Sequence, residues 1–374
     1  MTSETNTVKA TCLCGEAKHE VALPSSAYPL KAYFCHCDSC RHSTGALCNT
    51  VAFLGNYYTP ARALIDKLQS FQFSKRITQY FCPQCGTLML SRCLKDAEGS
   101  SDVTEWGVAT GTLEQADGVI EVQAHEHVAD TLDGGFSDFL QKVSDEGIER
   151  WPHGFREGEQ LPLYWHSSSK PHVEPSLTDK LHAHCKCGGI NFWIARPSER
   201  STLGKVSWPD VLIPAHSDAP KPSLETWWIC DSGNKFFAGV CSCDSCRLAC
   251  GMEWIEWAFV PTVDITLDED GKVPFSRDFS TLKHYRSSGR ATRHFCGTCG
   301  ATVFWDGDER PQLIDVAAGL LDAPEGARAE SWLEWGTGRL SFREDAMVRA
   351  ESLALGVEDG LQAYGKKQQG ASRS

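Results

Sequence analysis

The chain has 374 residues and a formal net charge of -13. Its length suits two domains of common size, and its acidic balance argues against nucleic acid or an anionic membrane surface as the main partner, because both require a basic face. The N-terminal residues show no leader pattern and no later apolar run is long enough to span a bilayer, so we expect a soluble, cytoplasmic protein with no membrane partner.

Eighteen cysteines are present, and most stand in C-x-C or C-x-x-C pairs. Cytosolic thiols are kept reduced, so cysteines at this spacing indicate metal ligands rather than disulfides. We therefore expect zinc as the cofactor, with up to two ions per domain.

Three cysteine motifs occur in the same order in both halves of the chain. The first half contains Cys12-x-Cys14-Gly, then Cys35-x-Cys37-x-x-Cys40-Arg41, then Cys82-x-x-Cys85-Gly. The second half repeats them as Cys185-x-Cys187-Gly, then Cys241-x-Cys243-x-x-Cys246-Arg247, then Cys296-x-x-Cys299-Gly. A repeat of this length predicts two tandem copies of one structural unit.

The repeat divides the chain into a first domain over residues 8–165 and a second over 180–355. A polar, Pro/Ser-rich linker is expected over 166–179. Residues 356–374 are expected to hold the end of a C-terminal helix, which begins near residue 343, and a disordered tail that starts at Lys366.

Apolar and polar side chains alternate around the motifs, for example at Val21 and Leu23 or at Phe192 and Ile194. Such alternation predicts half-buried strands. Helix signals are few; one covers residues 137–143, which begin with a serine of N-cap type. The predicted fold class is all-β, mainly antiparallel, in two homologous zinc-stabilised domains with few helices.

Five prolines between residues 197 and 222 mark a loop insertion that the first half lacks. Such a loop could form a wall or lid over a site. The alternative, a tolerated surface insertion, is the more common outcome.

Each half combines a C-x-C-G motif with a C-x-x-C-G motif. Together they offer four thiolates, and the glycines allow tight turns around a metal. We expect one structural zinc per domain, and the alternative is a set of ordinary buried cysteines. The predicted ligands are Cys12, Cys14, Cys82 and Cys85 in the first domain, and Cys185, Cys187, Cys296 and Cys299 in the second.

The central motif offers only three thiolates, and a zinc with three protein ligands keeps a position for water or an incoming thiol. The alternative is a closed site with a fourth protein ligand. Cys250 is the candidate for that ligand in the second domain, where the first domain has Thr44, so the sequence favours an open site in the first domain and leaves the second undecided. The candidate catalytic and metal-binding cysteines are Cys35, Cys37 and Cys40, and Cys241, Cys243 and Cys246.

Arg41 and Arg247 follow the last cysteine of each central motif and are also candidate catalytic residues. Either guanidinium would hold a substrate carboxylate or offset the negative charge of the thiolates. His36 and His42 could assist proton transfer in the first domain, although the second domain has no histidine at either position.

The order of these motifs, followed in each half by a V-A-x-G segment that ends at Gly111 or Gly319, resembles the glutathione-dependent formaldehyde-activating enzyme family, also called the centromere protein V/GFA domain. The resemblance implies a β-tent fold of antiparallel sheets. It implies a structural zinc on each four-cysteine set and a catalytic zinc on each three-cysteine set. It also implies carbon-sulfur lyase chemistry that joins glutathione and formaldehyde to give S-hydroxymethylglutathione.

The leading hypothesis is a zinc-dependent carbon-sulfur lyase that forms or cleaves an adduct between a thiol, with glutathione as the expected partner, and a small carbonyl such as formaldehyde. The alternative is a non-catalytic zinc-binding β module for protein interaction. Thiol-disulfide redox work is a third possibility, which the metal-ligand spacing makes less favourable.

Overall fold

The structure is a computed structural model, and it describes residues 5–55, 58–94, 104–174, 176–203, 206–215 and 226–371. Within these ranges the fold is mostly β, with antiparallel-rich sheets in two domains, as predicted. The linker residues described, 166–174 and 176–179, contain neither helix nor strand.

The first domain is built on an eight-stranded sheet with a separate hairpin of β1 (Thr5–Thr11) and β2 (Lys18–Pro24). Neighbours are antiparallel, except that β9 runs parallel to both β3 and β12. The strand order is β12 (Glu149–Arg150), β9 (Ile120–Glu126), β3 (Leu30–Cys35), β4 (Asn49–Phe53), β8 (Thr104–Ala109), β7 (Leu88–Leu94), β6 (Ile77–Phe81) and β5 (Gln69–Gln72).

The second domain repeats this plan. Its large sheet carries β23 (Leu333–Trp335) in parallel beside β16, and β13 (Lys180–His184), β14 (Asn191–Ala195) and β18 (Ile265–Thr266) form a separate small sheet. The order in the large sheet is β15 (Ile229–Cys230), β16 (Lys235–Cys241), β17 (Ile255–Pro261), β22 (Leu313–Ala317), β21 (Thr302–Gly307), β20 (Ala291–Cys296) and β19 (Leu282–Ser288).

Burial patterns explain why these segments form strands. In β13 every second residue is buried, which places Leu181 and Ala183 on the core face. All seven residues of β17 are buried, because this central strand is covered on both faces.

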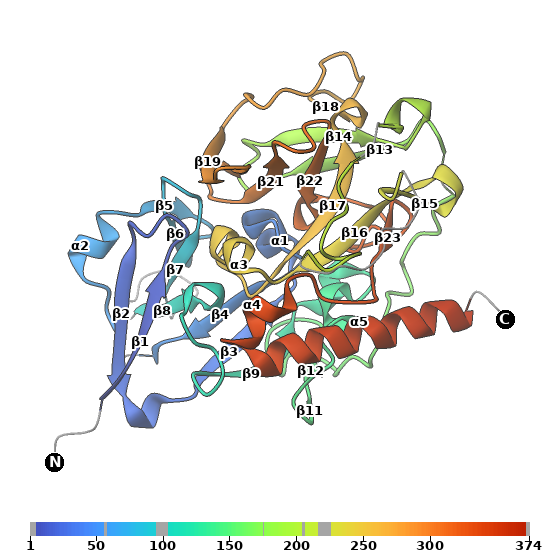
Figure 1. Cartoon of the computed structure of the whole chain (residues 1–374). Coiled ribbons are helices and arrows are strands. Elements are labelled where there is room, and N and C mark those ends of the chain that lie inside the picture. Colours follow the sequence, from blue (N-terminus) through green and yellow to red (C-terminus); the bar gives the residue numbers. More distant parts are fainter. Residues whose placement is uncertain are drawn as a thin grey trace.

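Two short equivalent helices lie between the sheets, α1 (Asp38–Thr44) and α3 (Asp244–Cys250), as Figure 1 shows. Each contacts a 3-10 turn of the other domain, α1 the turn Ala318–Leu320 and α3 the turn Thr110–Thr112. The two domains therefore share one continuous hydrophobic core.

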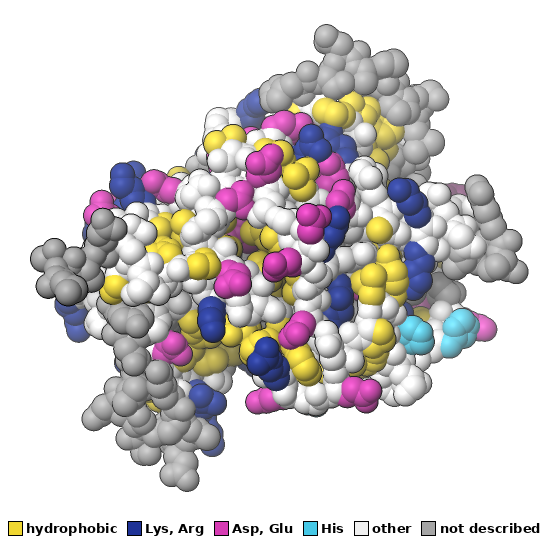
Figure 2. Space-filling model, turned by 90° about the horizontal axis from the view of Figure 1, so that it is seen from below, with side chains coloured by type: hydrophobic (Ala, Val, Ile, Leu, Met, Phe, Trp, Pro, Cys, Tyr) yellow, Lys and Arg dark blue, Asp and Glu magenta, His cyan; other side chains and the backbone are white. Residues whose placement is uncertain are grey.

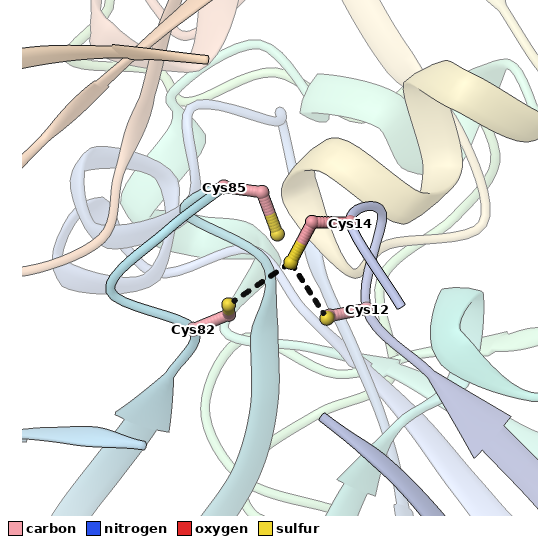
Figure 3. A group of neighbouring side chains, drawn as sticks. All are labelled: Cys12, Cys14, Cys82 and Cys85. Atoms are coloured by element: carbon pink, nitrogen blue, oxygen red, sulfur yellow. Dashed lines mark hydrogen bonds between the residues drawn. The ribbon is translucent and has the colours of Figure 1, made fainter. Parts of the chain in front are cut away.

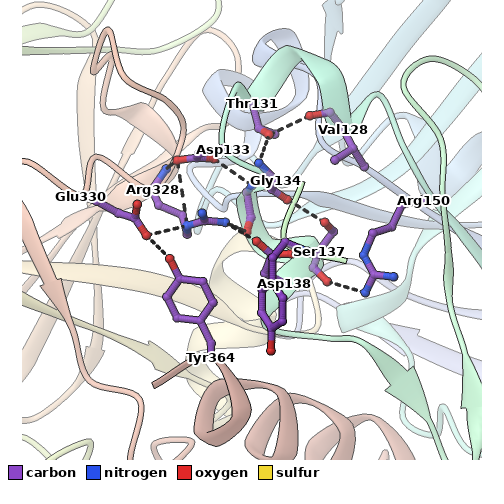
Figure 4. A network of polar contacts seen from close by, with 12 residues as sticks. Val128, Thr131, Asp133, Gly134, Ser137, Asp138, Arg150, Arg328, Glu330 and Tyr364 are labelled. Carbon is purple, nitrogen blue, oxygen red and sulfur yellow. Dashed lines mark hydrogen bonds and ion pairs between the residues drawn. The ribbon is translucent and has the colours of Figure 1, made fainter. Parts of the chain in front are cut away.

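Arg328 of the second domain is buried against the first. Its guanidinium donates to Asp138 at 2.9 Å, and its backbone amide donates to Asp133 at 2.8 Å (Figure 4). Glu330 and Tyr364 complete this polar network between the domains.

The C-terminal helix α5 (Glu351–Ala371) follows the short α4 (Arg343–Met347) and packs on the first domain (Figure 1). Gly356 and Gly360 permit this approach, because a Cβ there would lie 2.4 Å from the Lys142 carbonyl oxygen and 2.2 Å from that of Phe139. The helix continues to Ala371, so the prediction of disorder from Lys366 is wrong for residues 366–371, while 372–374 lie outside the described residues. Residues 366–370 are exposed, and polar contacts accompany the end of the helix: Lys367 Nζ lies 4.0 Å from the centre of the Tyr164 ring, and Gln368 donates to Tyr364 Oη at 2.7 Å.

The prediction of a helix over residues 137–143 is also wrong. The chain forms a 3-10 turn, Gly135–Asp138, and then a short hairpin of β10 (Lys142–Val143) and β11 (Glu146–Gly147). Ser137 donates its hydroxyl to the Gly134 carbonyl and does not cap a helix. The remaining α-helix, α2 (Arg62–Ile65), is a single turn.

Figure 2 shows the molecule from below the view of Figure 1. On this face, Lys/Arg and Asp/Glu side chains are interspersed with apolar ones. This mixture is typical of a solvent-exposed surface. Among the helices of the described ranges, none combines the length and the apolar character that crossing a membrane requires.

Candidate metal centre

The first four-cysteine group joins two distant loops of the first domain. Cys12 and Cys14 lie between β1 and β2, and Cys82 and Cys85 lie between β6 and β7 (Figure 3). Each pair is followed by a glycine with positive φ, 79° at Gly15 and 83° at Gly86. The chain can therefore turn tightly enough to aim both thiols of a pair inward.

The sulfur spacing of this group fits a tetrahedral zinc. The Sγ atoms are 3.4 Å apart between Cys12 and Cys14 and 3.6 Å apart between Cys14 and Cys82, and all four lie within 4.8 Å of one another. Zinc-sulfur bonds of about 2.3 Å in a tetrahedron place sulfurs about 3.8 Å apart. The backbone amide of Ala17 also donates to Cys12 Sγ at 3.2 Å, as expected for a thiolate.

The second-domain group has the same geometry. Cys187 Sγ lies 3.5 Å from both Cys185 Sγ and Cys296 Sγ, and Cys299 completes the set. The amide of Ile190 donates to Cys185 Sγ at 3.3 Å, which repeats the contact of Ala17 in the first domain. Both predicted four-cysteine sets are therefore assembled and could hold a metal.

Close thiols ionise unequally in these groups. Hydrogen bonds with Cys82 and Cys85 hold the pKa of Cys12 far below its usual range, whereas burial raises the pKa of Cys14 to about 12. Four thiolates at this distance repel one another, and a divalent cation would remove that repulsion.

Each three-cysteine group is built at the start of a short helix. In the first domain Cys35 ends β3, Cys37 is the N-cap of α1, and its sulfur accepts a hydrogen bond from the Cys40 amide at 3.3 Å. Cys241, Cys243 and Cys246 repeat this arrangement at the junction of β16 and α3. In both groups the three Sγ atoms lie within 4.8 Å of one another.

Cys250 does not join the second group. Its thiol donates back along α3 to the Cys246 carbonyl at 3.3 Å, in the same way that Thr44 Oγ1 donates to the Cys40 carbonyl at 3.0 Å. A side chain four residues after a helical carbonyl is positioned for this bond. The suggested role of Cys250 as a fourth ligand is therefore wrong, and the two groups do not differ in this respect.

The groups differ at a position that the sequence analysis did not single out. Both Nη atoms of Arg293 contact Cys246 Sγ, at 3.5 and 3.6 Å, from strand β20. Gln79 holds the equivalent position in β6, three residues before the C-x-x-C motif, and its amide donates to Ser43 Oγ at 3.4 Å. Aligning β6 and β20 on the C-x-x-C motif that follows each of them places Gln79 opposite Arg293 in the sequence, and this alignment would have singled out the position.

A cavity of about 770 Å³ opens beside the second three-cysteine group. Its lining includes Cys241, Cys243, Cys246 and Arg293, with Trp257, Phe259 and Trp305 among the wall residues. Part of the proline-rich insertion, residues 208–211 and 213–215, also lines it. The insertion is therefore a wall of the cavity, which was the less favoured of its two interpretations; residues 216–225 lie outside the described part of the chain.

The first group has different neighbours. Asn49 Nδ2 lies 3.8 Å from Cys40 Sγ, and His36 is buried beside it. His36 Nε2 lies 2.9 Å from His125 Nδ1, and His125 Nε2 donates to the Leu140 carbonyl. Burial lowers the pKa of His36 to about 3, so this histidine is neutral near pH 7.

Arg41 and Arg247 reach across the domain interface. Arg41 donates to the carbonyls of Gly319 and Leu321, at 3.2 and 2.9 Å, and Arg247 donates to the Gly111 carbonyl at 2.6 Å. Each also pairs with the aspartate three residues earlier. These contacts favour a structural role; the holding of a substrate carboxylate remains a prediction.

His42, His184 and Asp322 form a further group of possible ligands between the domains. The two imidazole rings stack with centroids 3.9 Å apart and an interplanar angle of 8°, and His42 Nδ1 donates to the His184 carbonyl. Parallel rings do not direct their free nitrogens to one point, as metal ligands must. We interpret this group as an interdomain contact, in which His42 faces the second domain.

Cys93 and Cys230 are half-buried free thiols, as the sequence suggested. Burial raises the pKa of Cys93 to about 11. Neither belongs to a metal-ligand group among the described residues.

The chain matches the family model described as glutathione-dependent formaldehyde-activating enzyme in two regions, residues 7–129 and 230–334. Each region contains one three-cysteine group. No curated protein shows a significant match to the chain.

Proposed function

The chain belongs to the glutathione-dependent formaldehyde-activating enzyme family, and from this premise we propose that it is a zinc-dependent carbon-sulfur lyase acting on a thiol, glutathione, and a small carbonyl such as formaldehyde. The observation that carries the proposal is the cavity of about 770 Å³ that opens on Cys241, Cys243 and Cys246. A concave, partly apolar cavity with convergent polar groups is the usual form of a small-molecule site.

The proposed reaction is an addition without oxidation or reduction. The sulfur of the thiol forms a bond to the carbonyl carbon, the C=O double bond becomes a single bond, and the thiol proton ends on that oxygen. The reverse reaction breaks the carbon-sulfur bond and returns the proton to sulfur.

The residues of the chain have distinct parts in this proposal. Cys241, Cys243 and Cys246 would hold the zinc, which supplies a thiol in its nucleophilic thiolate form near neutral pH. Arg293 places a positive charge beside the sulfurs. The aromatic side chains and the insertion line the cavity in which the reacting groups would meet.

The first-domain group supports a second candidate function. His36 is fully buried and its Nε2 lies 2.9 Å from His125 Nδ1, whereas the second domain has Ser242 in place of His36. These features suit a zinc-binding β module whose metal stabilises the fold or a protein-interaction surface without catalysis. A cytoplasmic location is part of both proposals, because the clustered thiols require a reducing compartment.

The test compares Cys37→Ser with Cys243→Ser in the full chain. Zinc content is measured for each, together with the rate at which glutathione and formaldehyde combine above the spontaneous rate. We expect Cys243→Ser to lose turnover and Cys37→Ser to retain most of it. Zinc-loaded wild-type protein that neither binds glutathione nor changes the adduct rate would overturn the lyase proposal in favour of the module.

A further inference from the structure

Arg293 is the side chain that distinguishes the two three-cysteine groups. It is 4% exposed, both its Nη atoms contact Cys246 Sγ, and it lines the cavity. The equivalent Gln79 is 1% exposed and donates to Ser43. One group therefore has a buried cation against its sulfur, and the other has a neutral amide nearby.

The consequence for ligand binding follows from counting charges. Three thiolates and one divalent cation sum to one negative charge, and a further thiolate raises this to two. In a buried site such an accumulation is costly, because little water screens it. The guanidinium of Arg293 returns the sum to one negative charge. Among the described residues of the first group, the side chain that contacts a sulfur in the corresponding way is neutral: Asn49 Nδ2 lies 3.8 Å from Cys40 Sγ.

We propose that Arg293 is a specificity-determining residue that allows the second three-cysteine group to accept a thiol as thiolate, and that the first group, with Gln79, does not accept one. The inference rests on the proposed function, which supplies the zinc and the thiol substrate. The proton released when the thiol binds passes to the buffer, and no electron transfer is involved.

Among the ion pairs of the described residues, none joins Arg293 to a carboxylate, although the charge of Asp315 acts on it from nearby. Arg310, the neighbouring cavity arginine, pairs with Asp315 at 2.8 Å. Among the described residues, the hydrogen-bond partner of both Arg293 Nη atoms is a thiol sulfur. An arginine guanidinium keeps its proton in proteins, so Arg293 remains a cation in this position.

The experiment uses the full chain loaded with Co²⁺ in place of zinc, because sulfur-to-cobalt charge-transfer absorption reports each added thiolate ligand. The probe is 2-mercaptoethanol, which has no carboxylate that an arginine could bind. Imidazole is the neutral comparison ligand. We expect Arg293→Gln to weaken 2-mercaptoethanol binding by about 10- to 100-fold and imidazole binding much less, since one charge-assisted contact is lost.

Three further variants control this result. Arg293→Lys keeps the charge and should restore most of the thiol affinity. Arg286→Gln removes an exposed arginine that pairs with Asp308 outside the cavity, and should bind as wild type does. Cys37→Ser should keep the thiol response and Cys243→Ser should lose it.

The outcomes separate the inference from the function on which it rests. A folded Arg293→Gln protein that binds 2-mercaptoethanol like wild type overturns the role of Arg293 and leaves the lyase proposal standing. Wild-type protein without any thiol response overturns both. If Arg293→Gln does not fold, the cysteine variants decide: a response lost in Cys37→Ser and kept in Cys243→Ser would place thiol binding in the first domain and overturn the inference.

Discussion

The amide of Gly319 in the second domain donates a hydrogen bond to the carbonyl of Gly45 in the first, at 2.8 Å. Its counterpart, with the domains exchanged, is the bond from Gly111 to the carbonyl of Gly251, at 3.0 Å. Reciprocal pairing of this kind defines a twofold, isologous interface. The tandem chain therefore packs its two domains as a symmetric dimer packs two subunits, with each three-cysteine helix held against the other domain.

Gly111→Ala should disturb this interface. A Cβ at residue 111 would lie 2.0 Å from the Met252 carbonyl oxygen. The atoms that it meets belong to the backbone of Gly251 and Met252, which cannot move aside as a flexible side chain could. We expect a loss of about 1–3 kcal/mol in the free energy of unfolding, measured with urea. Gly289→Ala is the control, because its Cβ would have no neighbour within 4 Å. Equal stability of the two variants would show that the interface does not form in solution.

Arg328→Met should leave the buried carboxylates of Asp133 and Asp138 without their cation, although the backbone amide of residue 328 can still donate to Asp133 (Figure 4). Breaking a buried pair on one side costs about 3–5 kcal/mol, so we expect a loss of that size in unfolding free energy at pH 7.5. Burial already raises the pKa of both carboxyls, and removing the cation raises it further. Protonation then neutralises them as the pH falls, so the deficit should shrink toward pH 5.

The control is Arg62→Met, which removes a surface ion pair with Asp66 whose arginine side chain is 87% exposed. Exposed pairs contribute about 0–1 kcal/mol. A deficit for Arg328→Met that is as small as that of Arg62→Met, or that does not depend on pH, would contradict the arrangement in Figure 4.

Glu256 should make stability depend on pH. Burial raises its pKa from 4.5 to about 8, and one carboxyl oxygen accepts a hydrogen bond from the Leu47 amide at 2.7 Å in the other domain. Between these pKa values the folded chain keeps a proton that the unfolded chain releases, so stability falls as the pH rises, by about 1.4 kcal/mol per pH unit at most. Below pH 4.5 both states are protonated and the effect is absent.

Glu256→Gln keeps the shape and removes the titration. The free energy of unfolding of this variant relative to wild type should therefore increase from pH 5 to pH 8, as measured by urea unfolding at several pH values. A difference that stays constant over this range would mean that Glu256 has an ordinary pKa in the folded protein.

Cys12→Ser should remove the metal of the first four-cysteine group. Because metal binding to such a site contributes directly to folding, we expect one zinc fewer per chain and loss of cooperative unfolding of the first domain. Zinc analysis and calorimetry are the measurements. Cys93→Ser, a half-buried free thiol outside the group, should keep full zinc. Full zinc in Cys12→Ser would refute the assignment of the ligands.

The sequence predicted the parts of the site that are close together in the chain. Cys35, Cys37 and Cys40 fall within six residues, so their spacing alone brings them together at the start of α1. The four-cysteine groups join distant loops, yet the repeat revealed their pairing because the same order occurs twice.

Contacts between residues that are far apart in the chain could not be predicted from motif spacing. For Arg41 the sequence left two interpretations open, a substrate carboxylate or the charge of the thiolates. Neither includes its partners in the fold, the carbonyls of Gly319 and Leu321, which are backbone atoms about 280 residues away. Within the second domain, Arg293 lies outside the cysteine motifs. Its place three residues before Cys296 marks the position, but only the fold shows that its guanidinium contacts Cys246. The order of α5 likewise depends on its contact with the first domain, which composition does not show.

Asp210 should control the shape of the cavity, because it fastens the insertion to the segment that follows β23. Its carboxylate accepts hydrogen bonds from the Ala215 amide at 2.7 Å and the Phe342 amide at 2.6 Å, and pairs with Arg339 at 3.1 Å. Asp210→Ala leaves these donors without a partner, so the wall should loosen while the cysteines keep their places. We expect KM for the thiol to rise about tenfold with little change in kcat, and faster proteolysis within residues 206–215. The control is Asp270→Ala, which removes an exposed ion pair with Lys272. It should leave both KM and the rate of proteolysis unchanged. A lower kcat with unchanged KM would show instead that Asp210 acts on the reacting groups and not on the wall.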